Sequence, residues 1–217
     1  MIRLHHCPQT RSMRSLWLLN ELRVAFEIVE WPFDKTLRGS EYLALNPAGR
    51  VPALELDGQL IWETGAIAET LCERFSPEEL GRPPGHAERV DWLIWIHFAE
   101  TISQHTATLT QQHVVLYNDS MRSPIVMKLE AKRIEKCFEA LEALLSDGRR
   151  HLLKSGFSAA DVGVGQAVYM ARHFTLHDTM PLLTAWYERI TAREGFIRSL
   201  PADTKLYARD FYEAWDA

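Results

Sequence analysis

The chain has 217 residues, a length between one large domain and two small ones, since most globular domains hold about 100 to 150 residues. Hydrophobic residues make up 47% and charged residues 24% of the sequence, so disordered and fibrous classes are excluded. The net charge is −5 with the signs interspersed. This balance gives no electrostatic reason to expect nucleic acid or an anionic membrane as a partner.

The cysteines and the N-terminal segment favour a cytoplasmic protein. Cys7, Cys72 and Cys137 form no CxxC pair and no cluster with histidine at ligand spacing, so we expect neither a disulfide framework nor a metal site. Residues 1–14 carry polar side chains where a secretory signal needs an unbroken apolar run. No run of about 18 apolar residues follows, so we expect no membrane partner.

The distribution of proline divides the chain into two parts. Seven of the ten prolines lie in the first 84 residues, and proline interrupts both helix interiors and central strands. The turn-rich and charged segment at 79–86 predicts a linker. We therefore expect one domain at 1–78 and a second at 87–217.

The first part predicts an α/β domain with the order βαβαββα and a mixed sheet that carries helices on its faces. Alternation of apolar and polar residues predicts strands at 2–5, 26–31, 53–56 and 59–62. Asp57-Gly58 predicts a hairpin between the last two strands. Helical spacing predicts helices at 11–22 and 64–75, with a short helix before the third strand. In the later helix, the residues expected on the buried face are Ile67, Leu71 and Phe75.

The second part predicts helices throughout, because apolar residues recur at i, i+3, i+4 and i+7 in three stretches. We expect the faces that they form to pack on one another, with His97 as a hydrogen-bonded core residue. The faces are Val90, Leu93, Ile94 and His97; Ile134, Cys137, Phe138, Leu141 and Leu145; and Leu182, Leu183, Trp186, Tyr187 and Ile190. Ser158 and Asp161 have the spacing of a capping box, which predicts a buried helix beginning at Ser158.

Pro52 lies where a strand begins, and this leaves the main-chain groups of Val51 free to pair with an extended, peptide-like ligand. The bond between the two residues can be cis or trans, because an X–Pro bond loses most of the preference for trans. Taken alone, the segment favours trans.

Two further segments place hydroxyl groups at helix starts. Thr64 follows the strand ending at Trp62, and its hydroxyl with the first N–H groups of the helix could hold a carboxylate. Thr10 and Ser12 precede the first helix, where they could donate to an anion. The alternative for each segment is simple capping of the helix.

Together these segments resemble the cytosolic glutathione transferases of serine or threonine type. Residues 46–52 (NPAGRVP) are similar to the family's Asn-Pro-x-Gly-Lys-Val-Pro, residues 63–67 (ETGAI) to its Glu-Ser-x-Ala-Ile, and residues 157–161 (FSAAD) to its Phe-Ser-x-Ala-Asp. The motifs have the family's order and spacing over nearly the whole chain. The resemblance implies a thioredoxin-like N-terminal domain followed by an all-α C-terminal helical domain.

The resemblance also implies that glutathione is the co-substrate and binds along these segments. Glu63 and Thr64 would hold its γ-glutamyl end, and the main chain of Val51 would pair with its cysteinyl backbone. Arg50 falls where the family often has a lysine near the glycyl carboxylate, and its planar guanidinium could bind that group through two hydrogen bonds. Pro52 would be the family's cis-proline.

The activating hydroxyl is expected at Thr10, four residues before Arg14, where serine-type members of the family carry serine. Ser12 is the second candidate. Lowering a thiol pKa of about 8.5 by two units needs roughly 2.7 kcal/mol of extra thiolate stabilisation. One charge-assisted hydrogen bond of about 1.5–3 kcal/mol and a helix N-terminus of about 0.3–1 kcal/mol supply it. Thr10 therefore needs only to donate to the sulfur.

The second substrate, a small hydrophobic electrophile, is expected between the domains against the first long helix of the second part. Trp95, Phe98 and His105 supply an aromatic and partly titratable surface there. The resemblance further implies a homodimer. The sequence thus predicts a glutathione transferase that conjugates the thiolate to such electrophiles.

Two alternatives stay open. The first is a glutathione-dependent reductase of disulfides or peroxides, which would use Cys7 or a second glutathione. The second is a non-catalytic interaction module that keeps the fold. The presence of Arg50, Glu63 and Thr64 argues against the module.

Overall fold

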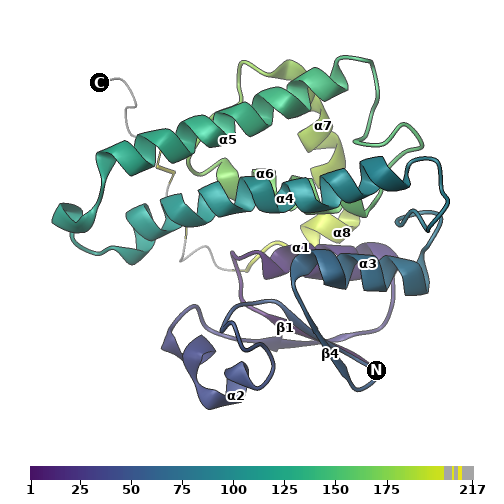
Figure 1. Ribbon diagram of the computed structural model, residues 1–217, viewed down its shortest axis with the longest axis horizontal. Coiled ribbons are helices and arrows are strands. Elements are labelled where there is room, and N and C mark those ends of the chain that lie inside the picture. Colours follow the sequence, from purple (N-terminus) through teal and green to yellow (C-terminus); the bar gives the residue numbers. More distant parts are fainter. Residues whose placement is uncertain (203–206, 208–209, 212–217) are drawn as a thin grey trace.

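The computed structural model describes residues 1–202, 207 and 210–211. Its N-terminal half contains a four-stranded mixed sheet in the order β2-β1-β3-β4, and β2 is the strand parallel to β1. The helices α1 and α3 lie between this sheet and the second domain, and α2 lies on the other side (Figure 1). The elements are β1 (Ile2–His6), α1 (Ser12–Leu22), β2 (Glu27–Glu30), η1 (Lys35–Arg38), α2 (Ser40–Leu43), β3 (Ala53–Leu56), β4 (Gln59–Trp62) and α3 (Thr64–Phe75).

The hairpin predicted at Asp57-Gly58 is confirmed. Leu56 pairs with Gln59, so the two turn residues connect β3 to β4 directly. Both turn residues have positive φ, 49° and 87°, which is the geometry that matches the twist of the flanking strands. The predicted thioredoxin-like order of elements is therefore present.

The second half is helical, as predicted. Its long helices α4 and α5 lie side by side, and α6 packs behind them against both α4 and α1 (Figure 1). The elements are α4 (Arg89–Thr110), the π-helix η2 (Gln111–Val115), η3 (Asp119–Met121), α5 (Pro124–Leu145), α6 (Ala159–Ala171), α7 (Pro181–Thr191) and α8 (Glu194–Ile197). Gly165 of α6 lets Trp17 of α1 approach closely, since an added Cβ would lie 3.1 Å from the indole ring. The two domains thus share one core.

The predicted capping box at the start of α6 is confirmed. The Ser158 hydroxyl accepts a hydrogen bond from the first turn, and the Asp161 carboxylate accepts one from the Ser158 N–H at 3.0 Å. The same carboxylate accepts hydrogen bonds from Leu152 N at 3.0 Å and from the Trp186 indole at 2.9 Å. Asp161 is completely buried. One carboxylate therefore fixes the start of α6, the loop before it and α7.

The connection between α3 and α4, where the sequence predicts a linker, is packed against the helical domain. The carbonyl of Leu80 accepts hydrogen bonds from the Trp92 indole and from Ala159 N, each at 3.0 Å. Arg82 is buried, and its guanidinium donates to the Ser155 hydroxyl at 2.5 Å. The segment therefore takes part in holding the two domains together.

The prediction for the buried face of α4 is wrong. Val90 is 67% exposed, Ile94 is 52% exposed, and the side chain of His97 is 65% exposed. The buried face is Trp92, Ile96, Ala99, Ile102, Ser103, Thr106, Leu109 and Thr110. Because α4 carries apolar residues on two sides, its spacing does not show which side faces the core. Phe75 of α3, also predicted to be buried, is exposed at the end of its helix.

The faces predicted for the later helices agree better with the structure. The α5 residues are all buried, and on α7 only Leu182 of the predicted face is exposed. Among the described residues, no helix has both the length and the apolar character needed to cross a bilayer.

We expect Asp161→Ala to lower the free energy of unfolding by about 3 kcal/mol, because buried donors from three segments lose their acceptor. Ser158→Ala removes only the hydroxyl cap and should cost about 1 kcal/mol. Urea unfolding of the two variants checks this. Equal losses would contradict a structural role for Asp161 beyond the cap.

Candidate functional site

The loop before β3 forms one edge of the site. The Val51–Pro52 bond is cis, as the resemblance implies and against the expectation from the segment alone. The carbonyl of Arg50 accepts hydrogen bonds from the Tyr42 hydroxyl at 2.8 Å and from the Asn46 amide at 2.6 Å. These two hydrogen bonds fix the main chain at Arg50, while its side chain is exposed.

The turn between β1 and α1 brings Thr10 and Ser12 together at different depths. The Thr10 hydroxyl donates to the carbonyl of Cys7 at 2.7 Å and lies 2.8 Å from the Ser12 hydroxyl. Ser12 is completely buried, accepts from Cys7 N at 3.0 Å and lies 2.8 Å from Nδ1 of His6. Burial lowers the pKa of His6 to about 4, so its imidazole is neutral at physiological pH. Of the two candidate hydroxyls, Thr10 therefore lies nearer the surface, with Ser12 behind it.

The start of α3 contradicts one interpretation of Thr64, that of a simple helix cap. Glu63 has a φ of 74°, a conformation disfavoured for residues other than glycine and often found at functional sites. The Thr64 hydroxyl does not cap the helix. It donates to Oε1 of Glu100 at 2.6 Å and accepts from Arg14 at 3.0 Å. The hydroxyl is therefore already bound to a carboxylate of the chain itself.

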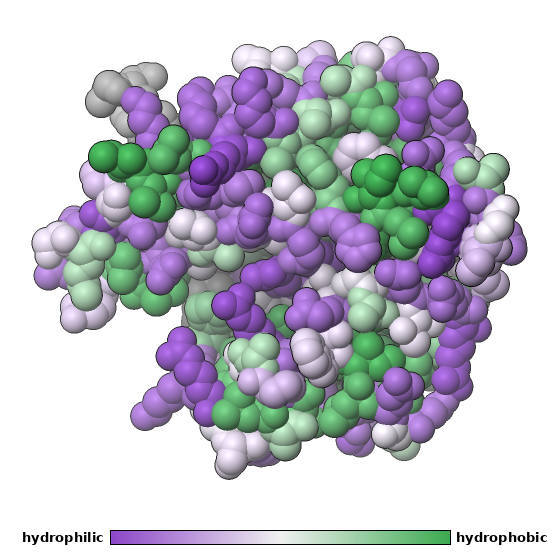
Figure 2. Space-filling model, in the orientation of Figure 1, coloured by the Kyte–Doolittle hydropathy of each residue, from purple (hydrophilic) through white to green (hydrophobic). Residues whose placement is uncertain are grey.

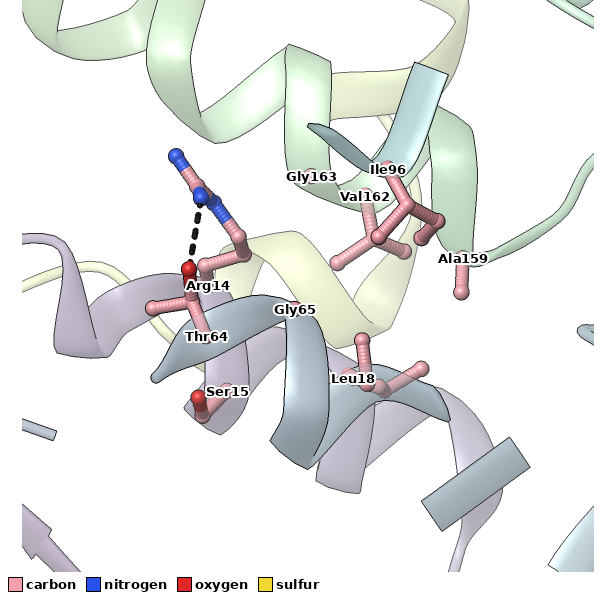
Figure 3. A pocket seen from close by; sticks show the side chains of 10 residues that line it. Arg14, Ser15, Leu18, Thr64, Gly65, Ile96, Ala159, Val162 and Gly163 are labelled. Atoms are coloured by element: carbon pink, nitrogen blue, oxygen red, sulfur yellow. Dashed lines mark hydrogen bonds between the residues drawn. The ribbon is translucent and has the colours of Figure 1, made fainter. Parts of the chain in front are cut away.

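Arg14 is the centre of this cluster, and its guanidinium points at Thr64 from α1 (Figure 3). It also donates to Oε1 of Glu100 at 2.5 Å and to the Ser103 hydroxyl at 2.9 Å. Arg11 donates to the second oxygen of Glu100 at 2.8 Å. Although burial opposes ionisation, the charge of Arg14, the Thr64 hydrogen bond and the charge of Arg11 lower the pKa of Glu100 to about 2. This cluster joins α1, α3 and α4.

A small cavity of about 10 Å³ lies beneath the cluster, between α1, α3, α4 and α6 (Figure 3). Its volume is that of a single water position. Two buried polar atoms of residues that line it, Nε of Arg14 and the Ser15 hydroxyl, have no hydrogen-bond partner among the described residues. The cavity is too small for any part of a substrate.

A larger cleft of about 740 Å³ lies between the domains, within the range of small-molecule sites. Figure 2 shows the surface hollowed between the helical domain and the region of α2. Thr10 and Val51 line the cleft, together with four cationic residues and one carboxylate: Arg11, Lys35, Arg38, Arg50 and Asp34. The cleft is thus cationic in a chain whose net charge is −5. Such a lining suits an anionic ligand.

The structure corrects the residues predicted for the second substrate. Trp95 and Phe98 do not line the cleft; their rings lie 5.1 Å apart and pack on the core. Nδ1 of His105 lies 2.6 Å from Glu130 of α5. Aromatic residues on α4 were expected in the site because of their chemistry, and the residue spacing does not show which side of the helix faces the cleft. The residues that line it from the helical domain are Ser103, Thr106, Ala107, Thr108, Thr110, Gln111, Val115, Met170 and Tyr207.

Sequence reasoning therefore missed a row of hydroxyl groups. Ser103, Thr106 and Thr110 are spaced i, i+3 and i+7, which places them on one side of α4. That spacing was visible in the sequence, but polar residues at helical spacing usually indicate a solvent-exposed face. Tyr207 lies too far along the chain for any local pattern to connect it with them.

The three cysteines lie inside the protein. All three are free and buried, and burial, together with the charges of Glu30 and Asp34, raises the pKa of Cys7 to about 12. Within residues 1–202, 207 and 210–211 there is no group of three or more His, Cys, Asp or Glu residues that could hold a metal ion.

Comparison with known proteins decides the family. Residues 6–74 match the model of the glutathione S-transferase N-terminal domain, and residues 124–189 match that of the C-terminal domain. The chain belongs to the glutathione S-transferase family. This confirms the predicted family, the two-part fold and the activity class of a glutathione transferase.

Individual relatives agree with this assignment. The chain is 28% identical to glutathione S-transferase GstB of Escherichia coli K12, over 83% of this chain and 94% of that protein. It is 34% identical to glutathione S-transferase 3 of Schizosaccharomyces pombe, over 46% of this chain and 41% of that protein. A theta-class enzyme of Xanthomonas axonopodis with glutathione bound has the same fold, with a TM-score of 0.81, 23% identity and coverage of 93% and 98% of the two chains.

The ionised Glu100 should make stability depend on pH. Its folded-state pKa of about 2 lies below the ordinary 4.5, so its stabilising effect is complete above pH 4.5 and is lost as the pH falls towards 2. We expect the free energy of unfolding to fall more steeply over this window in the wild type than in Glu100→Gln. Urea unfolding at a series of pH values measures it.

Glu41→Gln, at an exposed position on α2, is the control and should follow the wild-type curve. A Glu100→Gln curve parallel to the wild type would show that the cluster does not hold Glu100 ionised.

Proposed function

We propose that this enzyme binds glutathione along the cleft, lowers the pKa of its thiol through Thr10, and adds the thiolate to a small electrophile held against α4. The observation that carries the proposal is the Thr10 hydroxyl, which lies at the start of α1 and lines the same cleft as Val51 and Arg50. Proteins bind anions readily at helix N-termini, because the main-chain N–H groups and the helix dipole favour negative charge.

Glutathione would lie extended, with its cysteinyl backbone against the main chain of Val51 beside Pro52. The exposed guanidinium of Arg50 would bind the glycyl carboxylate through two hydrogen bonds. At the other end, the exposed carboxylate of Glu63 would attract the γ-glutamyl ammonium. The first N–H groups of α3 would bind the γ-glutamyl carboxylate. Because the Thr64 hydroxyl is bound to Glu100, it would act by fixing this helix start.

The hydrogen bonds around Thr10 allow its hydroxyl to turn and donate to a thiolate at little cost. In the structure the hydroxyl donates to the carbonyl of Cys7, which also accepts a hydrogen bond from the Ser12 hydroxyl at 3.0 Å. If Thr10 turned to the sulfur, Ser12 would still satisfy that carbonyl. Ser12 N also donates to the Thr10 oxygen at 3.3 Å, which polarises the hydroxyl. Ser12 is therefore proposed as a positioning residue for Thr10.

The same geometry gives no support to a redox role for Cys7. A thiol with a pKa of about 12 is not ionised at neutral pH, and the thiolate is the reactive form. Cys7 is also 1% exposed. We therefore place the reactive sulfur on glutathione. The three free cysteines are consistent with a reducing compartment, and we propose a cytoplasmic location.

The hydroxyl is tested by three variants. Thr10→Ala should raise the pKa of the bound glutathione thiol by about one to two units, because one charge-assisted hydrogen bond is lost. Thr10→Ser keeps the donor and should stay close to the wild type. The ultraviolet absorbance of the thiolate, followed against pH, gives the pKa.

Ser12→Ala should have a smaller effect, because Thr10 remains in place. If Ser12→Ala raised the thiol pKa and Thr10→Ala did not, the hydroxyl would be assigned to the wrong residue. If neither variant changed it, the mechanism would be wrong.

We also propose that the enzyme is a homodimer, joined through the exposed apolar side of α4 and the edge strand β4. Val90 and Ile94 of α4 and Trp62 of β4 are exposed, although they are large and apolar. Figure 2 shows apolar patches on this face of the molecule, over α4 and below it. Apolar patches on an otherwise charged surface often mark interfaces. A second copy would explain why α4 is apolar on two sides.

Ile94→Asp should convert the dimer to a monomer, because it places a charge in an apolar interface. Size-exclusion chromatography with light scattering measures the mass. Leu176→Asp is the matched control, since Leu176 is 53% exposed and Ile94 is 52% exposed. A dimer that survives Ile94→Asp would place the interface elsewhere.

A further inference from the structure

Arg11 is a cation of the cleft that is bound to the helical domain. It follows Thr10 directly in the chain, lines the same cleft, and donates to Oε2 of Glu100 of α4 at 2.8 Å. The other three cationic residues of the cleft come from η1 and the loop before β3, in the sheet domain. Arg11 is therefore fixed next to the residue proposed to hold the thiolate and to the helix against which the electrophile would lie.

The ion cluster that includes Arg11 holds more positive than negative charge. Glu100 is bound by two guanidinium groups, Arg11 on one oxygen at 2.8 Å and Arg14 on the other at 2.5 Å. One positive charge is therefore not balanced within the cluster. Burial lowers the pKa of Arg14, Glu100 opposes this effect, and the charge of Arg11 lowers the pKa again, because the two guanidinium groups repel each other. An anion bound at Arg11 would balance the excess charge.

Arg11 and Ser103 both have donors available for a ligand in the cleft. The side chain of Arg11 is 31% exposed, and Glu100 accepts from only one of the several N–H groups that a guanidinium carries. The Ser103 hydroxyl also lines the cleft and accepts from Arg14 at 2.9 Å, and no residue in the described part of the chain accepts its proton. A hydrogen bond received from a cation makes a hydroxyl a better donor. A guanidinium and a hydroxyl near one carboxylate of α4 thus suit a single anionic group.

We propose that the second substrate is an electrophile that carries an anionic group such as a carboxylate, and that Arg11 is the residue that selects it. This rests on the proposed activation of glutathione by Thr10. The thiolate sulfur forms a bond to the electrophilic carbon, and the leaving group departs with the electron pair of the bond that breaks. The anionic group is bound by Arg11 and takes no part in the bond changes. The sequence alone predicts only a hydrophobic electrophile.

The physical reason is the repulsion between two anions. Glutathione reacts as a thiolate, so in water an anionic electrophile approaches it against the repulsion of like charges. A guanidinium beside Thr10 attracts the anionic group and offsets this repulsion, whereas a neutral electrophile gains nothing from it. The attraction also raises the rate of association, and this gain falls as the ionic strength rises.

Two benzylic chlorides of nearly the same shape test this. In para-chloromethylbenzoate a carboxylate stands where para-chloromethylbenzamide has a neutral amide, and in both the sulfur displaces chloride. Each kcat/KM is divided by the rate constant of the uncatalysed reaction with glutathione. The wild type should then prefer the benzoate about tenfold or more, and the preference should shrink at high salt.

Arg11→Gln should lower kcat/KM for the benzoate about ten- to hundredfold, the effect of losing a hydrogen bond between charged groups. For the benzamide it should change kcat/KM less than about twofold, which also shows that the variant is folded. Arg11→Lys keeps the positive charge and should keep most of the preference.

Arg38→Gln is the matched control, because Arg38 is an exposed arginine that lines the same cleft from η1. It should leave the preference for the benzoate unchanged. If Arg38→Gln removed the preference, the general charge of the cleft would be responsible and the role of Arg11 would be overturned.

A wild type without a preference for the benzoate, or a preference that survives in Arg11→Gln, would overturn the inference. Equal losses for the two electrophiles in Arg11→Gln would show that Arg11 acts on glutathione, and would overturn it as well. A wild-type enzyme that does not lower the thiol pKa would instead contradict the proposed function, and this inference with it.

Discussion

A guanidinium group buried between two domains must be paired where it lies, because an isolated charge in a protein interior is far less stable than in water. Arg14 occupies such a position. It leaves α1, which belongs to the sheet domain, and binds Thr64 of α3 together with Glu100 and Ser103 of α4. Both walls of the cleft are thereby fixed to one side chain. The relative placement of the walls therefore depends on this ion cluster as well as on the apolar core that the two domains share.

The cluster also explains why the residues of the glutathione motifs are at different depths. Thr64 and Arg14 are buried, so on the proposed mode of binding they would act on the ligand through the helix starts that they fix. Thr10 lies one turn before Arg14 on the chain and reaches the cleft. Arg50 and Glu63 are exposed at the two ends, where the charged termini of an extended tripeptide would lie. On the proposed mode of binding, the residues that shape the site are thus separate from those that would contact the ligand.

Much of the fold could be predicted because its signals are local. The turn at Asp57-Gly58, the capping box at Ser158 and the strand alternation each depend on residues a few positions apart, and the structure contains all of them. The facing of α4 could not be predicted, since a helix with apolar residues on two sides satisfies the spacing rule twice. The resulting error placed Trp95 in the cleft. Pairs such as Arg14 with Glu100, or Thr110 with Tyr207, depend on tertiary packing and leave no local pattern.

The Thr10 hydroxyl can change its hydrogen-bond partner at little cost. It donates to the carbonyl of Cys7, which also accepts a hydrogen bond from the Ser12 hydroxyl. Thr10 can therefore turn to a ligand without leaving that buried carbonyl unpaired. On the proposed mechanism it would exchange a neutral acceptor for the negatively charged thiolate, which accepts a stronger hydrogen bond. A donor of this kind would stabilise the thiolate without a general base or a reactive cysteine.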